Sequence, residues 1–234
     1  TLHHHAGQFR AWKNNHYPEA DDPGIRASVY RFLENAERPT KDGTSPFQPT
    51  APKVNNIMDA FKAASNIDKA IVAPSWLDDR NEPVPSQILA MQNGLLDLST
   101  GNLLPPTPEF WTFNALNYDY SEQAPECINW ISFLNSIWED DVQSLQTLQE
   151  IFGYLLTSDT RQQKAFLLVG PKRSGKGTIA RILTALLGQD NICSPTLASL
   201  SSQFGLAPLI DKLVAIIADA RLSSKADQQQ ITER

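Results

Sequence analysis

A glycine-rich turn between an apolar run and a helical pattern constrains this chain more than any other feature. Residues 166–178 read FLLVGPKRSGKGT and satisfy the spacing G-x-x-x-x-G-K. The apolar residues 166–169 predict a strand, and residues 176–187 predict a helix. A strand, such a turn and a helix in this order form a phosphate-binding loop, because glycines let backbone N–H groups approach the anion and the helix N-terminus favours its charge. A turn that binds nothing is the weaker interpretation, because strand, loop, lysine and helix all agree.

The whole turn is expected to contact a bound nucleotide. The expected binding residues are Gly170, Pro171, Lys172, Arg173, Ser174, Gly175, Lys176, Gly177 and Thr178. Lys176 is expected to act in catalysis by reaching the terminal phosphates as a point charge. Basic residues also gather near the turn in the sequence, at Arg161, Lys164, Lys172, Arg173, Lys176 and Arg181.

One position of the turn departs from the pattern. Gly177 follows the lysine, where a Ser or Thr hydroxyl usually holds Mg²⁺. The hydroxyl comes one residue later, at Thr178. One residue rotates a side chain by about 100° around a helix. Thr178 is therefore predicted either to contact phosphate or to reach the metal through a water.

A second motif follows at the end of another apolar run. Residues 213–218 read LVAIIA, which predicts a buried central strand of a parallel sheet, and Asp219 comes directly after them. An acid at the end of such a strand, downstream of a phosphate loop, is the usual carboxylate on the Mg²⁺ side. We therefore predict Asp219 as a catalytic residue and, with Thr178, as a metal ligand. The alternative is an aspartate that caps a turn at the strand end.

Composition sets weaker limits. The chain has 234 residues, a net charge of −6, 41% hydrophobic residues and 20% charged residues, which fits one or two ordinary globular domains. No apolar run is long enough to cross a membrane. Cys127 and Cys193 are isolated, which indicates a reducing, cytoplasmic setting. The histidines at positions 3–5 are a weak metal signal, and no zinc role is expected for them.

The patterns divide the chain into three parts. These are a mixed α+β domain at 1–122, a helical linker or collar at 123–160, and the first part of a nucleotide-binding α/β domain at 161–234. A helix capped by Asp22, with Pro23 at its first position, opens the first part after a strand pair. The other expected elements are a surface linker at 38–52, a helix at 54–61, a strand at 87–91, a hairpin at 95–104, a strand at 113–120, helices at 125–138 and 142–157, and a short helix at 198–206.

Several longer strings are specific enough to indicate a family. They are LHHHAGQFRAW at 2–12, NGLLD at 93–97, FNALNY at 113–118, QEIFGY at 149–154, QKAFLLVGPKRSGKGT at 163–178 and DARL at 219–222. On these residues nearly the whole chain resembles the phage and plasmid primase–helicase family, whose superfamily-three DNA helicases follow a primase domain. Residues 2–33 are similar to the start of the domain that precedes the motor.

The resemblance implies a fold and a function together. The fold would be an α/β P-loop NTPase core of the AAA+-like type, incomplete in this chain, behind a mixed α+β domain. The function would be an ATP-dependent DNA helicase motor of phage or plasmid replication that moves on single-stranded or forked DNA. It also implies ATP and Mg²⁺ as cofactors, a hexameric ring, a primase domain in the same polypeptide, and the cytoplasm of a bacterium or phage-infected host. Lys176 and Asp219 carry over as the phosphate and Mg²⁺ residues.

Two departures from the family pattern affect the expected activity. Ala220 stands where a second acid often orients the attacking water, and the nearby acids are Asp227 and Glu233. The sensor residue, the channel loop and the arginine finger are expected beyond Arg234. We therefore expect the chain to be a piece of a longer protein, and to hydrolyse ATP slowly by itself.

Two other functions stay open. The first is an initiator or loader module that binds ATP without hydrolysing it, which Ala220 favours. The second is a nucleotide kinase, because adenylate-kinase-like enzymes share the ending GKGT. Those enzymes place the loop near the N-terminus, whereas here more than half of the chain precedes it.

Overall fold

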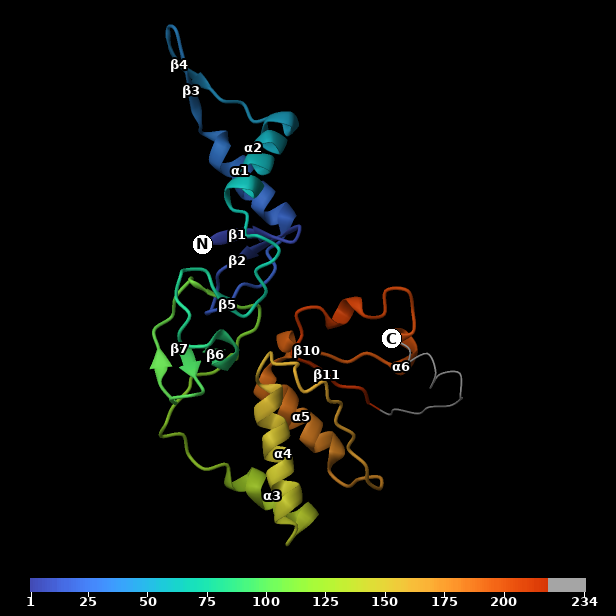
Figure 1. The fold of residues 1–234 in the computed structure, drawn as a ribbon. Coiled ribbons are helices and arrows are strands. Elements are labelled where there is room, and N and C mark those ends of the chain that lie inside the picture. The colour runs from blue at the N-terminus through green and yellow to red at the C-terminus, as the bar shows by residue number, and fades with distance from the viewer. Residues whose placement is uncertain (219–234) are drawn as a thin grey trace.

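Small sheets and short helices alternate along the chain in the computed structural model, which describes residues 1–218. The strands are β1 (Leu2–His5), β2 (Gln8–Ala11), β3 (Glu37–Thr40), β4 (Gly43–Pro46), β5 (Ser75–Trp76), β6 (Ile88–Met91), β7 (Gly94–Asp97), β8 (Leu103–Leu104), β9 (Phe110–Trp111), β10 (Ile192–Cys193) and β11 (Val214–Ala215). The α-helices are α1 (Asp22–Glu34), α2 (Ala51–Ala64), α3 (Ile128–Trp138), α4 (Val142–Leu155), α5 (Lys176–Leu187) and α6 (Leu197–Leu200). The β3–β4 hairpin lies at one end of the molecule and α3 at the other (Figure 1).

The N-terminal part is built on the antiparallel pair β1–β2. Helices α1 and α2 pack on this pair through a core of Phe9, Leu33, Val54 and Met58. Helix α1 was predicted to be capped by Asp22, but the cap is Asp21, whose carboxylate accepts the Gly24 N–H at 2.9 Å. The cap lies one residue earlier because Asp21 keeps an extended backbone outside the helix, as a cap requires.

The expected linker at 38–52 contains a hairpin instead. Strands β3 and β4 pair antiparallel and are largely exposed to solvent. Pro39 and Pro46 are compatible with this pairing, because each described strand of the pair has only one neighbour and its other edge needs no ladder hydrogen bond. Helix α2 follows and confirms the second predicted helix.

A second core lies where β5 and β9 meet β6, β7 and β8. The predicted strand at 87–91 and the hairpin that follows it are confirmed. The strand predicted at 113–120 is wrong, because the regular strand here is β9 at Phe110–Trp111. Residues 116–118 run beside β6 with only isolated contacts, such as the hydrogen bond from the Leu116 N–H to the Ala90 carbonyl at 2.8 Å.

Helices α3, α4 and α5 confirm the predicted helices of the C-terminal half. Phe152 and Leu155 of α4 pack with Leu183 and Leu187 of α5 in a further core. Helix α3 buries less than its sequence suggested: Ile128 remains 67% exposed and Ile131 47% exposed. Helix α6 is shorter than predicted and ends at Leu200. No helix among residues 1–218 is both long and apolar enough to pass through a bilayer.

The two apolar runs flanking α5 do not form the long strands predicted for them. Residues 166–169 are outside any strand, and Leu167 and Val169 are 79% and 84% exposed. Of residues 213–218 only Val214 and Ala215 are in a strand, which pairs parallel with β10. A strand needs a neighbour for its hydrogen bonds, and no described segment lies beside 166–169 as a strand.

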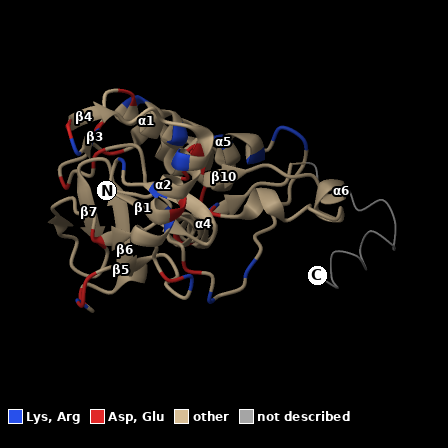
Figure 2. Ribbon diagram, turned by 90° about the horizontal axis from the view of Figure 1, so that it is seen from above, with Lys and Arg blue, Asp and Glu red and all other residues tan. Residues whose placement is uncertain are grey.

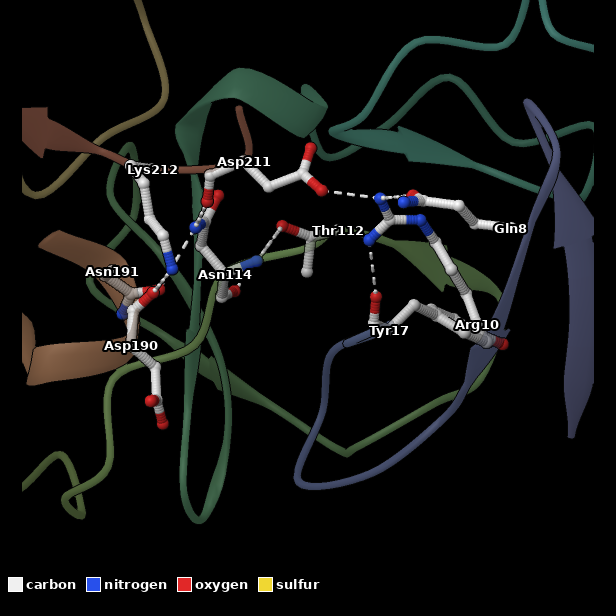
Figure 3. A network of polar contacts seen from close by, with 9 residues as sticks. All are labelled: Gln8, Arg10, Tyr17, Thr112, Asn114, Asp190, Asn191, Asp211 and Lys212. Atoms are coloured by element: carbon white, nitrogen blue, oxygen red, sulfur yellow. Dashed lines mark hydrogen bonds and ion pairs between the residues drawn. The ribbon is translucent and has the colours of Figure 1, made fainter. Parts of the chain in front are cut away.

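A polar network joins the N-terminal hairpin to the segment that precedes β11 (Figure 3). Asn114 donates from its side-chain amide to the Asn191 side chain at 3.0 Å and to the Asp211 carbonyl at 2.8 Å. The Arg10 guanidinium donates to the Asp211 carboxylate and, at 3.2 Å, to the Tyr17 carbonyl. Residues from both ends of the described chain therefore share one network.

Candidate functional site

The predicted phosphate-binding loop forms a tight turn that leads directly into α5. Gly175 has a φ of +89° and precedes the first helical residue, Lys176. Its carbonyl accepts the N–H groups of Thr178 at 2.8 Å and Ile179 at 3.0 Å, which starts the helix. Arg173 also has a positive φ, +66°. The left-handed backbone at Gly175 is the conformation that glycine adopts at least cost, so the sequence spacing has a local structural reason.

Lys176 lies across the loop rather than away from it. Its Nζ donates to the carbonyls of Gly170 and Pro171, both at 2.8 Å, and to the Ser174 hydroxyl at 3.2 Å. A Cβ on Gly170 would stand 2.8 Å from the Ser174 hydroxyl, so a side chain there would crowd this arrangement. The loop thus brings together Gly170, Ser174 and Lys176, three of its predicted binding residues.

Helix α3 covers the loop, which the sequence did not predict. A Cβ on Gly175 would come within 2.6 Å of the Ile137 Cδ1 and 3.0 Å of the Phe133 Cζ. Only a residue without a side chain lets the loop and α3 approach this closely. Helix α3 lies in the predicted helical collar at residues 123–160. A helix of the collar therefore packs against the loop.

A cavity of about 570 Å³ opens between α3 and the loop. Its lining residues are Phe133, Ser136, Ile137, Arg173, Ser174, Gly175, Gly177, Thr178 and Arg181. This lining contains two arginines and no acid, so its charge suits an anion. Among the predicted binding residues, Lys172 and Pro171 lie exposed at the tip of the loop.

Of the two predicted metal ligands, Thr178 and Asp219, only Thr178 lies within the described residues. The Thr178 hydroxyl accepts a hydrogen bond from the Arg181 guanidinium at 3.0 Å and lines the cavity. Asp219, Ala220, Asp227 and Glu233 lie outside the described residues. Within residues 1–218 there is no group of three His, Cys, Asp or Glu side chains that could hold a metal ion.

The basic residues near the loop in sequence do not all reach it. Arg161 forms an ion pair with Asp159 at 2.7 Å, and Lys164 lines a different cavity, between the N-terminal part and the end of α4. Figure 2 shows Lys and Arg interleaved with Asp and Glu along much of the ribbon. The loop keeps Lys172, Arg173 and Lys176 as its cations, and Arg181 of α5 lines the cavity beside it.

The three histidines of β1 pack against aromatic rings. His3 lies 5.5 Å from Tyr17 and 5.8 Å from Trp111 between ring centroids, and desolvation by burial lowers the pKa of His3. The His5 Nε2 lies 3.1 Å from the Ile71 carbonyl. These contacts give the histidines a role in the N-terminal core.

Parts of this chain are similar to a protein family and to two known proteins. Residues 168–234 match a family of unknown function, DUF5906. The chain is 25% identical over 131 residues to the uncharacterized mitochondrial protein ymf21 of Marchantia polymorpha, covering 50% of this chain and 72% of that protein. It is 32% identical over 92 residues to replication protein E1 of European elk papillomavirus, covering 39% of this chain and 14% of that protein.

A further match runs from the start of β2, through α1, α2 and both central sheets, to α3. Residues 6–139, more than half of the chain, match the family described as D5 N terminal like. The match ends one residue after the C-terminus of α3, the helix that covers the glycine-rich loop. The chain belongs to the D5 N terminal like family.

Proposed function

We propose that this chain is the ATP-binding part of a DNA replication motor, a helicase of superfamily three that couples ATP hydrolysis to movement on single-stranded DNA. The observation that carries the proposal is the loop at residues 170–178. Lys176, Ser174 and Gly170 are brought together there, beside a cavity that holds arginines and no acid. Successive backbone N–H groups at a helix N-terminus, together with a lysine ammonium, can bind the oxygens of a triphosphate.

Different residues of the loop and of α5 would bind the phosphates and the metal. The N–H groups of the loop would bind phosphate oxygens, and Lys176 would exchange its carbonyl partners for the terminal phosphates. Arg173 and Arg181 add positive charge around the cavity. When bound, Mg²⁺ would neutralise charge on the phosphates, and the Thr178 hydroxyl and the Asp219 carboxylate are the proposed groups that hold it.

The proposed fold and partners follow from the same reasoning. We propose that residues 161–234 are part of a P-loop NTPase core of the AAA+-like type, and that the whole protein forms a hexameric ring around DNA. Membership of the D5 N terminal like family and the similarity to a replication protein support a role in replication. A primase domain in the same polypeptide, a phage or plasmid origin and a cytoplasmic site belong to this proposal as well.

A second candidate is a module that binds ATP as a structural switch without hydrolysing it. Ala220, which follows the proposed metal-side acid, favours it. The nucleotide kinase is a weaker candidate, because the loop lies deep in the chain and α3 of the preceding part packs directly on it.

The test is steady-state ATP turnover by the full-length protein, with and without single-stranded DNA, beside the variant Lys176→Ala. A motor should hydrolyse ATP, respond to DNA and lose activity in the variant. ATP binding without turnover would favour the switch, and phosphate transfer to AMP would favour the kinase. Equal ATP affinity in the variant and the parent protein would contradict the assignment of the loop.

A further inference from the structure

A second cavity lies next to the predicted phosphate cavity and differs from it in chemistry. It has a volume of about 680 Å³ between the start of α3 and the first turns of α5. Its lining residues are Glu126, Cys127, Ile128, Asn129, Trp130, Phe133, Thr178 and Ile182. Most of this lining is apolar or aromatic, with an amide and a carboxylate among it, as in cavities that hold flat organic ligands.

The two cavities share part of their walls. Phe133 and Thr178 line both of them. Thr178 is the last residue of the loop, and Ile182 lies one helical turn further along α5. A ligand whose anionic end lies on the loop would therefore meet apolar side chains when it extends past Thr178.

Apolar side chains around this second cavity remain open to solvent. Ile128 is 67% exposed and Ile182 is 39% exposed. Trp130 is held in place by stacking on Phe133, at 5.5 Å and 21°, and on Phe152, at 5.9 Å and 21°. An aromatic side chain that is already oriented loses little freedom on binding, which favours van der Waals contact with a flat ligand.

We propose that this cavity binds the base of the nucleotide whose phosphates lie on residues 170–178, so that α3 supplies the base site and the loop supplies the phosphate site. This inference rests on the proposed function and adds its base-binding residues: Trp130, Phe133 and Ile182. Asn129 offers both a donor and an acceptor at the cavity wall, which matches the edge of a purine.

One ligand can span both cavities, because Phe133 and Thr178 line each of them. An amphiphilic ligand with a polyphosphate and a flat apolar ring matches an acid-free cavity joined to an aromatic one.

The test compares two ligands that share phosphates and differ in the base. Binding of ATP and of inorganic tripolyphosphate is measured by calorimetry on the full chain and on the variants Ile182→Ala, Trp130→Phe and Lys176→Ala. Ile131→Ala is the matched control, because Ile131 is an exposed isoleucine of α3 that lines neither cavity. Tryptophan emission gives a second readout: the chain has five tryptophans, and the change that ATP causes in their total emission should be lost in Trp130→Phe.

Ile182→Ala should weaken ATP binding by about tenfold, the range expected when a base loses part of its apolar contact, and leave tripolyphosphate binding within about twofold. Lys176→Ala should weaken both ligands, and Ile131→Ala neither. Equal loss of both ligands in Ile182→Ala would overturn the base site, because it would mean that the loop itself was disturbed.

The remaining outcomes distinguish failure of the base site from failure of the proposed ATP-binding function. If ATP and tripolyphosphate bind the parent equally well, the base makes no contact and the inference is wrong while the loop assignment stands. A change of oligomeric state in Ile182→Ala, with ATP affinity intact, would mean that a second copy covers the cavity. If neither ligand binds the parent chain, the proposed function fails.

Discussion

The guanidinium of Arg10 and the carboxylate of Asp211 form an ion pair between positions 201 residues apart in the sequence. The Arg10 side chain is only 5% exposed, and its guanidinium carbon lies 3.6 Å from the centre of the Phe113 ring. Asp211 has a φ of +60°, a conformation that aspartate tolerates better than most residues. The pair therefore ties the N-terminal hairpin to the chain just before β11.

Arg10→Ala should destabilise the protein by about 2–4 kcal/mol, because it removes a buried guanidinium from an ion pair with the half-buried Asp211 and leaves hydrogen-bond acceptors without their donor. Urea unfolding measures the change. Arg80→Ala is the matched control: Arg80 pairs with Asp78 at the surface, where both side chains are more than 30% exposed. Surface pairs contribute little to stability, so similar losses in the two variants would contradict a structural role for Arg10.

Gly175→Ala should reduce stability by about 2–5 kcal/mol and weaken ATP binding. An alanine here must adopt the left-handed backbone, at a cost of about 1–2 kcal/mol, and its Cβ meets Ile137, at a cost of about 1–3 kcal/mol. Gly177→Ala is the control, because its Cβ would have only an ordinary contact with Arg181, at 3.8 Å. In the first turn of α5, that change should raise stability by about 0.5–1 kcal/mol in the absence of nucleotide. If thermal unfolding ranks the two alanine variants equally, the close approach of α3 is wrong.

Asp97→Ala should destabilise the protein at neutral pH by about 1–3 kcal/mol. The Asp97 carboxylate accepts hydrogen bonds from the Ser99 hydroxyl at 2.7 Å, the Ser99 N–H at 2.9 Å and the Thr100 hydroxyl at 2.9 Å. The bond from the Ser99 hydroxyl is the main cause that lowers the pKa of Asp97 below its usual 3.8.

The sign of the pH effect follows from that lower pKa. Stability from the charged carboxylate is fully present above pH 3.8 and is lost as the pH falls through the lowered value in the folded protein. The difference between Asp97→Ala and the parent should therefore shrink in acid. Asp79→Ala, at an exposed aspartate, should stay within about 0.5 kcal/mol of the parent at every pH. A pH-independent difference for Asp97→Ala would rule out the charged network.

Asp219→Asn in the full-length protein should spare ATP binding and reduce hydrolysis. The amide keeps the shape of the side chain but loses the charge proposed to hold Mg²⁺. Affinity should change by no more than a few-fold, whereas turnover should fall by about 100-fold or more. Unchanged turnover would show that another acid holds the metal.

The sequence predicted correctly those elements whose first and last residues are determined by residues next to them in the chain. Helix α5 was expected at 176–187 and occupies Lys176–Leu187, since Gly175 before it and Gly188 after it both adopt positive φ. The hairpin of β7 and β8 was predicted from the turn residues at 99–102. The cap of α1 was missed by one residue because two aspartates stand side by side and only the backbone decides between them.

Elements that depend on distant partners could not be predicted in the same way. Residues 166–169 have the composition of a buried strand, but a strand forms only where another strand lies beside it. The cover of the glycine-rich loop by Phe133 and Ile137 is likewise a contact across the sequence. The one available signal was the composition of α3, INWISFLNSIW, whose apolar residues extend around more than one face and therefore exceed what a single core contact uses.

The internal bonds of Lys176 set a threshold for any anion that approaches the loop. Its ammonium group already has three oxygen partners within 3.2 Å, so a ligand must compete with them rather than fill an empty place. A single phosphate or sulfate offers Lys176 few new hydrogen bonds in exchange for the three that it would break. A longer polyphosphate can engage the loop N–H groups and the lysine together. The affinity of the loop for a ligand should therefore depend first on the number of its phosphates and only then on its other groups.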